Sequence, residues 1–227
     1  MTTRKSPRLV ATTMVIMLVA LPAAAQSPAP SRAARVGVLT AGVTTDPGKF
    51  LQLLTEAFHG VTRAGLVWNP DNPAITELRL LDRWDAAARA SGLSLKFVQA
   101  RSIEQLDAGF ATLATEKISA AFVVADPLWF AQDKRAAEAA LRHRVTAIWG
   151  HTSIADAGGL MAYAPDIVDQ FRQAAGYVKK ILTGTNAGDL PLQYPSRWTL
   201  VVNLKTAKAI GVTVSPATIA RADRVIE

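Results

Sequence analysis

Short apolar runs alternate with longer segments of helical periodicity along most of the chain. Each run is four to eight residues long and is bounded by Gly, Pro, Asn or Asp, as strands are, whereas the segments between them repeat apolar residues every three or four positions. We predict strands at 35–40, 64–69, 93–100, 119–126, 145–150, 159–164 and 198–203, and helices at 49–60, 74–91, 102–117, 130–144, 152–159 and 166–183. The tail from Leu204 is predicted to be helical, with an interruption at 211–216. This alternation is typical of an α/β fold with a mainly parallel sheet.

The N-terminal segment has the pattern of a secretory signal peptide. Basic residues Arg4, Lys5 and Arg8 precede an uncharged run at 9–21, and three alanines follow at 23–25. The run is shorter than the roughly 20 residues that span a bilayer. We therefore expect export to the periplasm with cleavage after Ala25, and a retained membrane anchor is the alternative. Residues 26–35, rich in Pro, Ser and Ala, are expected to form a disordered leader.

Length, cysteine content and net charge exclude several classes of protein. Half of the 227 residues are hydrophobic, which is ample for one packed domain and short for two full ones. The absence of Cys excludes thiol chemistry and disulfides. The formal net charge of +7 falls to +4 when the three basic residues of the signal peptide are removed. Because the other basic residues are scattered along the chain, we expect no nucleic-acid interface.

Motifs of common enzymes are missing from the sequence. It contains no glycine-rich dinucleotide or phosphate loop, no GxSxG nucleophile elbow and no HExxH metal motif. His59 and His143 are near the ends of predicted helices and are expected at the surface, whereas His151 follows a strand. No cluster has the spacing of metal ligands. We expect a binding protein rather than an enzyme, with no cofactor and no metal.

Polar side chains follow three of the predicted strands. Asn69, Asp71 and Asn72 follow "LVW", Asp126 follows "FVVA", and His151 follows "AIWG". In an open parallel sheet the carboxyl ends of the strands share one edge, and ligands bind there. Amide, carboxylate and aromatic groups at that edge suit a small polar or amino-bearing ligand.

Each of these residues also has a structural interpretation. The "NPDNP" segment at 69–73 has the composition of an ordinary turn. Asp126 precedes Pro127 and can cap the next helix. Trp149 and Tyr163 are aromatic residues that can simply pack in the core.

Several stretches of the sequence resemble the substrate-binding proteins of ABC transporters, in the periplasmic-binding-protein-like group that includes tryptophan and tyrosine transporter components. The resemblance runs in order from Val61 to Glu227, and "RVGVLT" at 35–40 is similar to the usual first strand. The matching stretches are "VTRAGLVWNPDNPA", "AAFVVADPLWF", "AIWGHTSIADAGGLMAYAPD", "FRQAAGYVKKILTG", "DLPLQYPSRWTLVVNLKTAKAIGVTVSP" and "ARADRVIE".

The resemblance implies two α/β lobes joined by crossover strands, with the ligand between them. It implies a first-lobe remnant and crossover helix at 36–59, a complete second lobe at 60–158, a return to the first lobe at 159–185 and a C-terminal crossover tail at 186–227. Only a short loop follows "RVGVLT" where the family carries most of its first lobe, so the resemblance also implies a truncated first lobe and weakened binding. The family's binding positions would fall on Asn69, Asp126, Trp149, His151 and Tyr163. The predicted ligand-binding set consists of these residues together with Thr40, Asp71 and Asn72.

The function that the resemblance implies is an exported solute-binding component of an ABC importer. Its ligand would be small and polar or aromatic, like an amino acid, and its partner an ABC permease. One alternative is a scaffold or sensory partner outside transport, which would form a homodimer through the first-lobe remnant. Another is a remnant without function.

Overall fold

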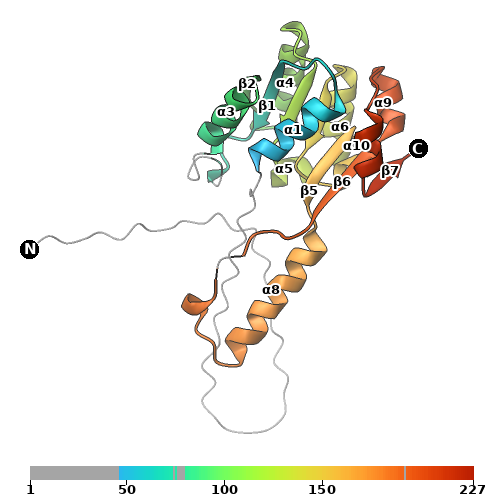
Figure 1. Cartoon of the computed structure of the whole chain (residues 1–227). Coiled ribbons are helices and arrows are strands. Elements are labelled where there is room, and N and C mark those ends of the chain that lie inside the picture. Colours follow the sequence, from blue (N-terminus) through green and yellow to red (C-terminus); the bar gives the residue numbers. More distant parts are fainter. Residues whose placement is uncertain (1–45, 74, 76–79, 192) are drawn as a thin grey trace, which may run out of the picture.

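The body of the protein is a twisted sheet with helices on both faces, and one helix extends away from it (Figure 1). The computed structural model describes residues 46–73, 75, 80–191 and 193–227. The sheet has seven strands in the order β2-β1-β3-β4-β5-β6-β7. The strands are β1 (Arg63–Trp68), β2 (Ser94–Gln99), β3 (Ala120–Val123), β4 (Thr146–Trp149), β5 (Met161–Pro165), β6 (Trp198–Asn203) and β7 (Arg224–Ile226). Strands β1 to β5 are parallel to one another, β6 is antiparallel to β5, and β7 is parallel to β6. The predicted α/β class with a mostly parallel sheet is confirmed.

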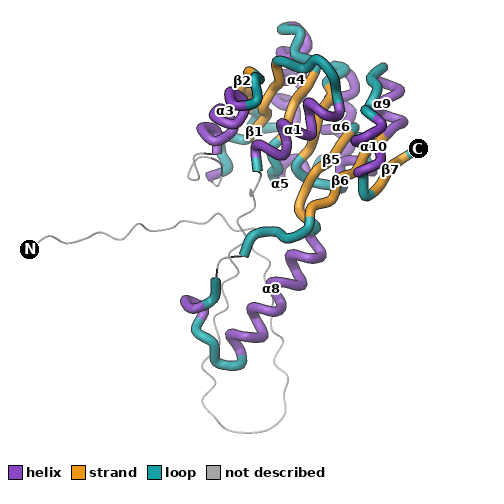
Figure 2. Tube along the Cα trace, viewed as in Figure 1, coloured by secondary structure: helices purple, strands orange, loops and turns teal. Residues whose placement is uncertain are grey.

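The helices follow the strands in the expected alternation (Figure 2). They are α1 (Pro47–Ala57), α3 (Leu80–Ala90), α4 (Ile103–Thr115), α5 (Pro127–Phe130), α6 (Asp133–Arg142), α7 (Ser153–Asp156), α8 (Ile167–Leu182), α9 (Leu204–Ile210) and α10 (Pro216–Arg221), with a 3₁₀ turn at Ala187–Asp189. Local signals set several helix starts. Ser102 accepts a hydrogen bond from the Gln105 amide, and Asp166 accepts bonds from Val168 and Asp169, as N-caps do. Part of the predicted helix at 74–91 and the predicted strand at 35–40 lie outside the described residues.

Apolar residues on alternate positions of the strands form two cores, one on each face of the sheet. On one face Phe50 of α1 meets Trp84 of α3 at 5.7 Å and Phe122 of β3 at 5.5 Å between ring centroids. On the other face Phe110 of α4 meets Trp149 of β4 at 6.1 Å. These rings are all nearly or fully buried. The sheet is thus covered on both sides, which explains the continuous apolar runs of its central strands.

Two predicted elements differ from the structure. The helix predicted at 130–144 is two helices, α5 and α6, because the chain turns at 131–132. Trp129 fixes that turn: its side chain is fully buried and its indole Nε1 donates to the carbonyl of Val124 at 3.0 Å. The tail predicted as helical ends instead in strand β7, which pairs with β6. Arg224 of β7 also forms a two-bonded ion pair with Asp156 at 2.6 and 3.0 Å, so a tertiary contact decides the conformation there.

The described segments that were expected in two different lobes meet at this one sheet. Helix α1 packs on it, and β5, β6 and β7 are three of its strands. The exception is α8, which follows β5 and extends beyond the edge of the sheet where β1, β3, β4 and β5 end (Figure 1). No residue of α8 is buried.

Candidate functional site

The loops after β1 and β3 are joined side chain to side chain at the carboxyl edge of the sheet. Asn72 Nδ2 donates to Asp126 Oδ2 at 2.9 Å, across 54 positions of sequence. The other carboxylate oxygen of Asp126 accepts from the Leu128 amide at 2.9 Å and so caps α5. Asp126 is only 2% exposed. Its carboxylate therefore links two loops and caps a helix at the same time.

The "NPDNP" segment forms a turn at the end of β1. Asn69 Oδ1 accepts from the Asp71 amide at 3.0 Å, and the Asn72 amide donates to the Asn69 carbonyl at 3.2 Å. This arrangement leaves the Asn69 Nδ2 group without a hydrogen-bond partner among the described residues. The turn directs the Asp71 carboxylate outward, where it pairs with Arg101 at 3.2 Å. Arg101 follows β2, so this exposed ion pair lies on the same edge of the sheet.

The end of β4 brings a buried imidazole to the same edge. His151 Nε2 lies 2.6 Å from Asp133 Oδ1, and Phe130 packs on its ring with centroids 4.3 Å apart. His151 is 6% exposed, and this burial lowers the pKa of its side chain, against the opposing effect of Asp133. Phe130 is 40% exposed, so one face of this aromatic pair is open to solvent.

Gly150 allows the ends of β3 and β4 to approach closely. A Cβ at this position would lie 2.8 Å from the Ala125 amide nitrogen and 3.0 Å from the Ala125 Cβ, closer than real contacts permit. The glycine therefore places His151 directly beside the loop that carries Asp126.

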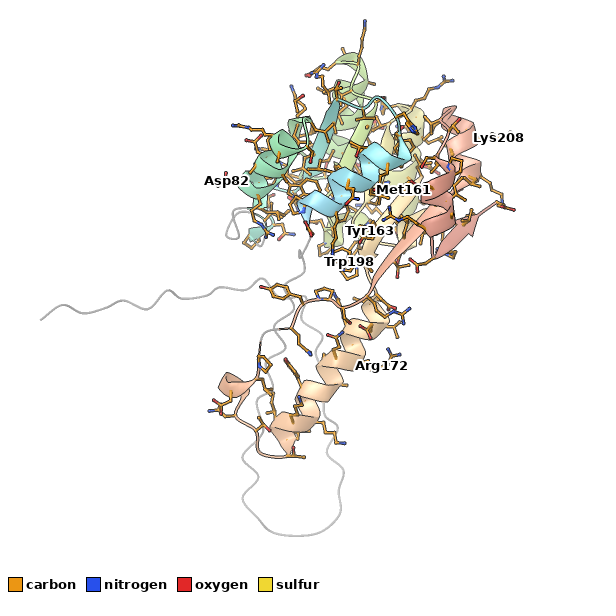
Figure 3. The ribbon with its side chains drawn as sticks, in the orientation of Figure 1. Asp82, Met161, Tyr163, Arg172, Trp198 and Lys208 are labelled. Carbon is orange, nitrogen blue, oxygen red and sulfur yellow. The ribbon has the colours of Figure 1, made fainter. Side chains whose placement is uncertain are left out.

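Trp149 and Tyr163 do not lie together, because they are on opposite faces of the sheet. Trp149 pairs in register with Ala162, so the next residue of β5, Tyr163, points to the other face. Trp149 is fully buried and packs edge-on against His151 at 6.0 Å. Tyr163 is partly buried and stacks on Trp198 at 5.0 Å (Figure 3).

A cavity of about 300 Å³ lies beside the Tyr163–Trp198 pair. Its walls also include Lys49 and Gln52 of α1, and Arg221 and Asp223 at the end of α10. A second cavity, of about 240 Å³, lies at the opposite edge of the sheet, around Ser119 and Thr146. The remaining predicted site residue, Thr40, lies outside the described residues.

Three residues at the carboxyl edge were not predicted as site residues. Arg101 follows β2, and the same strand-end rule that selected Asn69 would have found it. Phe130 and Asp133 were placed inside one long helix, and only the turn between α5 and α6 brings them to His151.

The carboxyl edge of the sheet offers hydrogen-bond donors, a carboxylate and an aromatic face, and these groups suit the binding of a ligand. Asn69 and Arg101 donate, Asp71 accepts, and Phe130 presents an exposed ring. Within the described residues no group of three or more His, Asp or Glu side chains is arranged to hold a metal ion. Nor does any described helix combine the length and the apolar character needed to cross a membrane.

A mostly parallel, doubly covered sheet with polar residues at its carboxyl edge is the architecture of periplasmic-binding-protein-like lobes. The sequence profile of the family described as ABC transporter substrate binding protein matches residues 39–226. The chain belongs to this family. No curated protein matches it in sequence.

Solved structures show the same fold. A conserved domain protein from Vibrio cholerae O1 biovar El Tor superposes with a TM-score of 0.71 and 24% identity, over 79% of this chain and 60% of its own. The ABC domain of Streptococcus pneumoniae in complex with L-Trp gives a TM-score of 0.69 and 18% identity, over 79% of this chain and 62% of its own. A solute-binding protein of an ABC transporter system from Conexibacter woesei superposes with a TM-score of 0.52 and 17% identity, over 81% of this chain and 58% of its own. The chain thus spans about 60% of the length of the first two proteins.

Proposed function

We propose that this protein is an exported solute-binding component of an ABC importer, and that it binds a small polar or aromatic amino-acid-like ligand at the carboxyl edge of its sheet. One observation carries the proposal: in a chain of this family, Asn69, Asp71, Arg101 and Phe130 are exposed or partly exposed around the joined loops of Asn72 and Asp126. The L-Trp complex of a similar fold supports the ligand class. The chemistry is binding rather than catalysis, in keeping with the family.

Each group at the edge has a role in this proposal. The Arg101 guanidinium and the Asn69 amide suit a ligand carboxylate, and Asp71 suits an ammonium group. Phe130, backed by His151, offers a face for an aromatic or apolar side chain. Asn72, Asp126 and Trp149 hold these groups in place, and Tyr163 belongs to the neighbouring cavity beside Trp198.

The proposal includes weak affinity. A ligand at this edge would be contacted by the described residues mainly from the side of the sheet, since α8 is the described helix that extends beyond it (Figure 1). Tight small-molecule sites bury most of the ligand surface. An open edge buries less, so we expect saturation only at high ligand concentration.

Calorimetric titration and thermal melting of the full chain with L-Trp, L-Tyr and other amino acids test the proposal. A bound ligand raises the melting temperature, because it stabilises only the native state. Arg101→Gln and Asp71→Asn are each expected to weaken binding roughly tenfold, since each removes a charge-assisted bond. Arg89→Gln is the matched control, because Arg89 is also exposed and paired, with Asp85 of α3. Absence of any ligand response, or an equal loss in the control, would reject the site.

Export and delivery to a permease are separate parts of the proposal. In a bacterial host, the mature protein is expected in the osmotic-shock fraction with Gln26 as its first residue. An N-terminus at Met1 in the membrane fraction would show a retained anchor instead.

A further inference from the structure

The cavity of about 300 Å³ beside Tyr163 and Trp198 has a wall of two aromatic rings. Trp198 lies opposite Pro165, two residues along β5 from Tyr163, so the two side chains are diagonal neighbours on one face of the sheet and stack at 5.0 Å. Phe50 of α1, itself 2% exposed, packs edge-on against both rings, at 5.2 and 6.2 Å. The stack is therefore fixed from the core, while Tyr163 and Trp198 remain partly exposed beside the cavity (Figure 3).

Polar groups of the cavity lack partners in the described part of the chain. Lys49, Tyr163 and Trp198 line the cavity, and the ammonium, hydroxyl and indole N–H of these side chains form no hydrogen bond to a described residue. Burial raises the pKa of Tyr163, so its hydroxyl remains a neutral donor at neutral pH. An aromatic wall with a few unpaired polar groups is the usual composition of a small-molecule site.

The charged groups of the cavity include one of each sign that can still bind a ligand. Lys49 forms no ion pair with a described residue, whereas Arg221 is paired with Glu56 of α1. Asp223 accepts from the Leu200 amide at 2.8 Å through Oδ2, and its Oδ1 accepts no bond from a described residue. A ligand with a single charge would meet a like charge here, whereas a zwitterion finds an opposite charge at both ends.

Two further carboxylates near the cavity are engaged within the chain. Asp46 caps α1 by accepting from the Gly48 amide at 3.0 Å. Glu56 accepts from Gln52 at 2.7 Å in addition to its pair with Arg221. Neither carboxylate is therefore as available to a ligand as the free oxygen of Asp223.

We propose that this cavity is a second binding site, which takes a zwitterionic aromatic amino acid. The ring of the ligand packs against Tyr163 and Trp198. Its carboxylate lies at Lys49 and its ammonium group at Asp223. The volume is at the lower limit of small-molecule pockets, about 300–1,000 Å³, which suits a single amino acid. The cavity shares no lining residue with the carboxyl-edge site, so either site can exist without the other.

Trp198 gives this site an optical signal of its own. The other tryptophans are at most 6% exposed, so iodide in solution reaches the partly exposed Trp198 most readily; they are Trp68, Trp84, Trp129 and Trp149. Titration of the full chain with L-Phe, which has no indole of its own, is expected to protect the tryptophan fluorescence from iodide quenching. Trp198→Phe is expected to remove that change.

Analogues that lack one group of L-Phe test the assignment of the ligand class. L-Ala lacks the ring, hydrocinnamate lacks the ammonium group and phenethylamine lacks the carboxylate. Each is expected to protect Trp198 only at concentrations at least roughly tenfold higher, because each loses one contact. Lys49→Gln is expected to weaken L-Phe roughly tenfold with little effect on phenethylamine. Asp223→Asn, which keeps an acceptor for the Leu200 amide, is expected to weaken L-Phe with little effect on hydrocinnamate.

Two control variants separate this site from other sources of the signal. Lys208→Gln is matched to Lys49→Gln, because Lys208 of α9 is also exposed and forms no ion pair with a described residue. Arg101→Gln alters the carboxyl-edge site and is expected to leave the protection of Trp198 unchanged.

Several results would overturn the second site. One is fluorescence that L-Phe does not protect, or protection that persists in Trp198→Phe; amino-acid binding without protection of Trp198 would reject this site and leave the function proposed above in place. Equal affinity for L-Phe and a singly charged analogue would overturn the zwitterion. A loss in Arg101→Gln as large as in Lys49→Gln would place the ligand at the carboxyl edge instead, and an equal loss in Lys208→Gln would show a general effect of charge.

Discussion

Replacing Asp126 separates its structural role from any role in ligand binding. In Asp126→Ala the cap of α5 is lost, at a cost of about 1 kcal/mol. The charged acceptor of Asn72 is lost as well, at about 1.5–3 kcal/mol for a hydrogen bond to a charged group. Because Asp126 is almost completely buried, water does not replace these bonds. We expect a total decrease of about 2.5–4 kcal/mol in the free energy of unfolding.

Asp126→Asn is expected to cost less, about 1–2 kcal/mol, because asparagine caps a helix as well as aspartate does. The assay is urea unfolding followed by the fluorescence of the five Trp residues. Asp85→Ala is the control: its carboxylate is partly exposed and pairs with Arg89 on the surface of α3, a pair worth at most about 1 kcal/mol.

A double-mutant cycle with Asn72→Ala isolates the link between the two loops. If the Asn72–Asp126 bond is the main interaction between them, the two effects are not additive, with a coupling of about 0.5–3 kcal/mol. Additive effects would show that this bond does not link the two loops, and an Asp126→Asn variant as unstable as Asp126→Ala would show that asparagine does not keep the cap of α5. If Asp126 instead contacts the ligand, Asp126→Asn weakens ligand binding far more than it lowers stability.

Three further predictions test other parts of the structure. In urea unfolding, Gly150→Ala is expected to destabilise the fold by about 1–3 kcal/mol, because the new Cβ would collide with Ala125. Gly176→Ala is expected to be neutral or to stabilise the fold by up to about 1 kcal/mol, because a Cβ there meets open space and alanine favours a helix. Burial lowers the pKa of His151, so this side chain binds a proton more readily in the unfolded chain than in the folded one. The stability that His151 contributes is therefore complete above its ordinary pKa of 6.5 and decreases as the pH falls below that value. His151→Gln should therefore lose less stability than the unmodified protein between about pH 7.5 and about pH 5, and an equal loss would contradict this assignment. In hydrogen exchange, the amides of α8 are expected to be far less protected than those of α4, because α8 buries no residue among those described. Equal protection of the two helices would show that further contacts hold α8 in place.

The elements that local sequence determines were predictable. Strand β3 is a continuous apolar run because both of its faces are covered, and Ser102 and Asp126 start helices through bonds to amides two or three residues away. The convergence of Asn72 and Asp126 was also predictable, since parallel strands end at one edge. All of this follows from short-range chemistry and one rule of sheet topology.

The features that depend on pairing between distant segments were not predictable. Tyr163 and Trp149 could be assigned to faces only once β4 and β5 were in register, because a shift of one residue reverses every side chain. Strand β7 needs the edge of β6 and the ion pair of Arg224 with Asp156. The contact of His151 with Asp133 needs the turn at 131–132, which Trp129 fixes from within the core.

In helix α8 the local sequence sets the two ends, whereas tertiary contacts decide how stable the helix is. Its limits follow from the sequence: Asp166 caps its start, and Lys179 and Lys180 suit its end. An isolated helix of this length is only marginally stable in water, and most helices in proteins gain their stability from a buried apolar face. The contacts that the other described residues make with α8 are largely polar: Ser196 bonds to Asp169 and Gln173, and the Tyr177 hydroxyl donates to the Pro191 carbonyl. Val168, Phe171 and Leu182 remain exposed on α8, so local sequence explains the limits of this helix while its apolar face packs on no described residue closely enough to be buried.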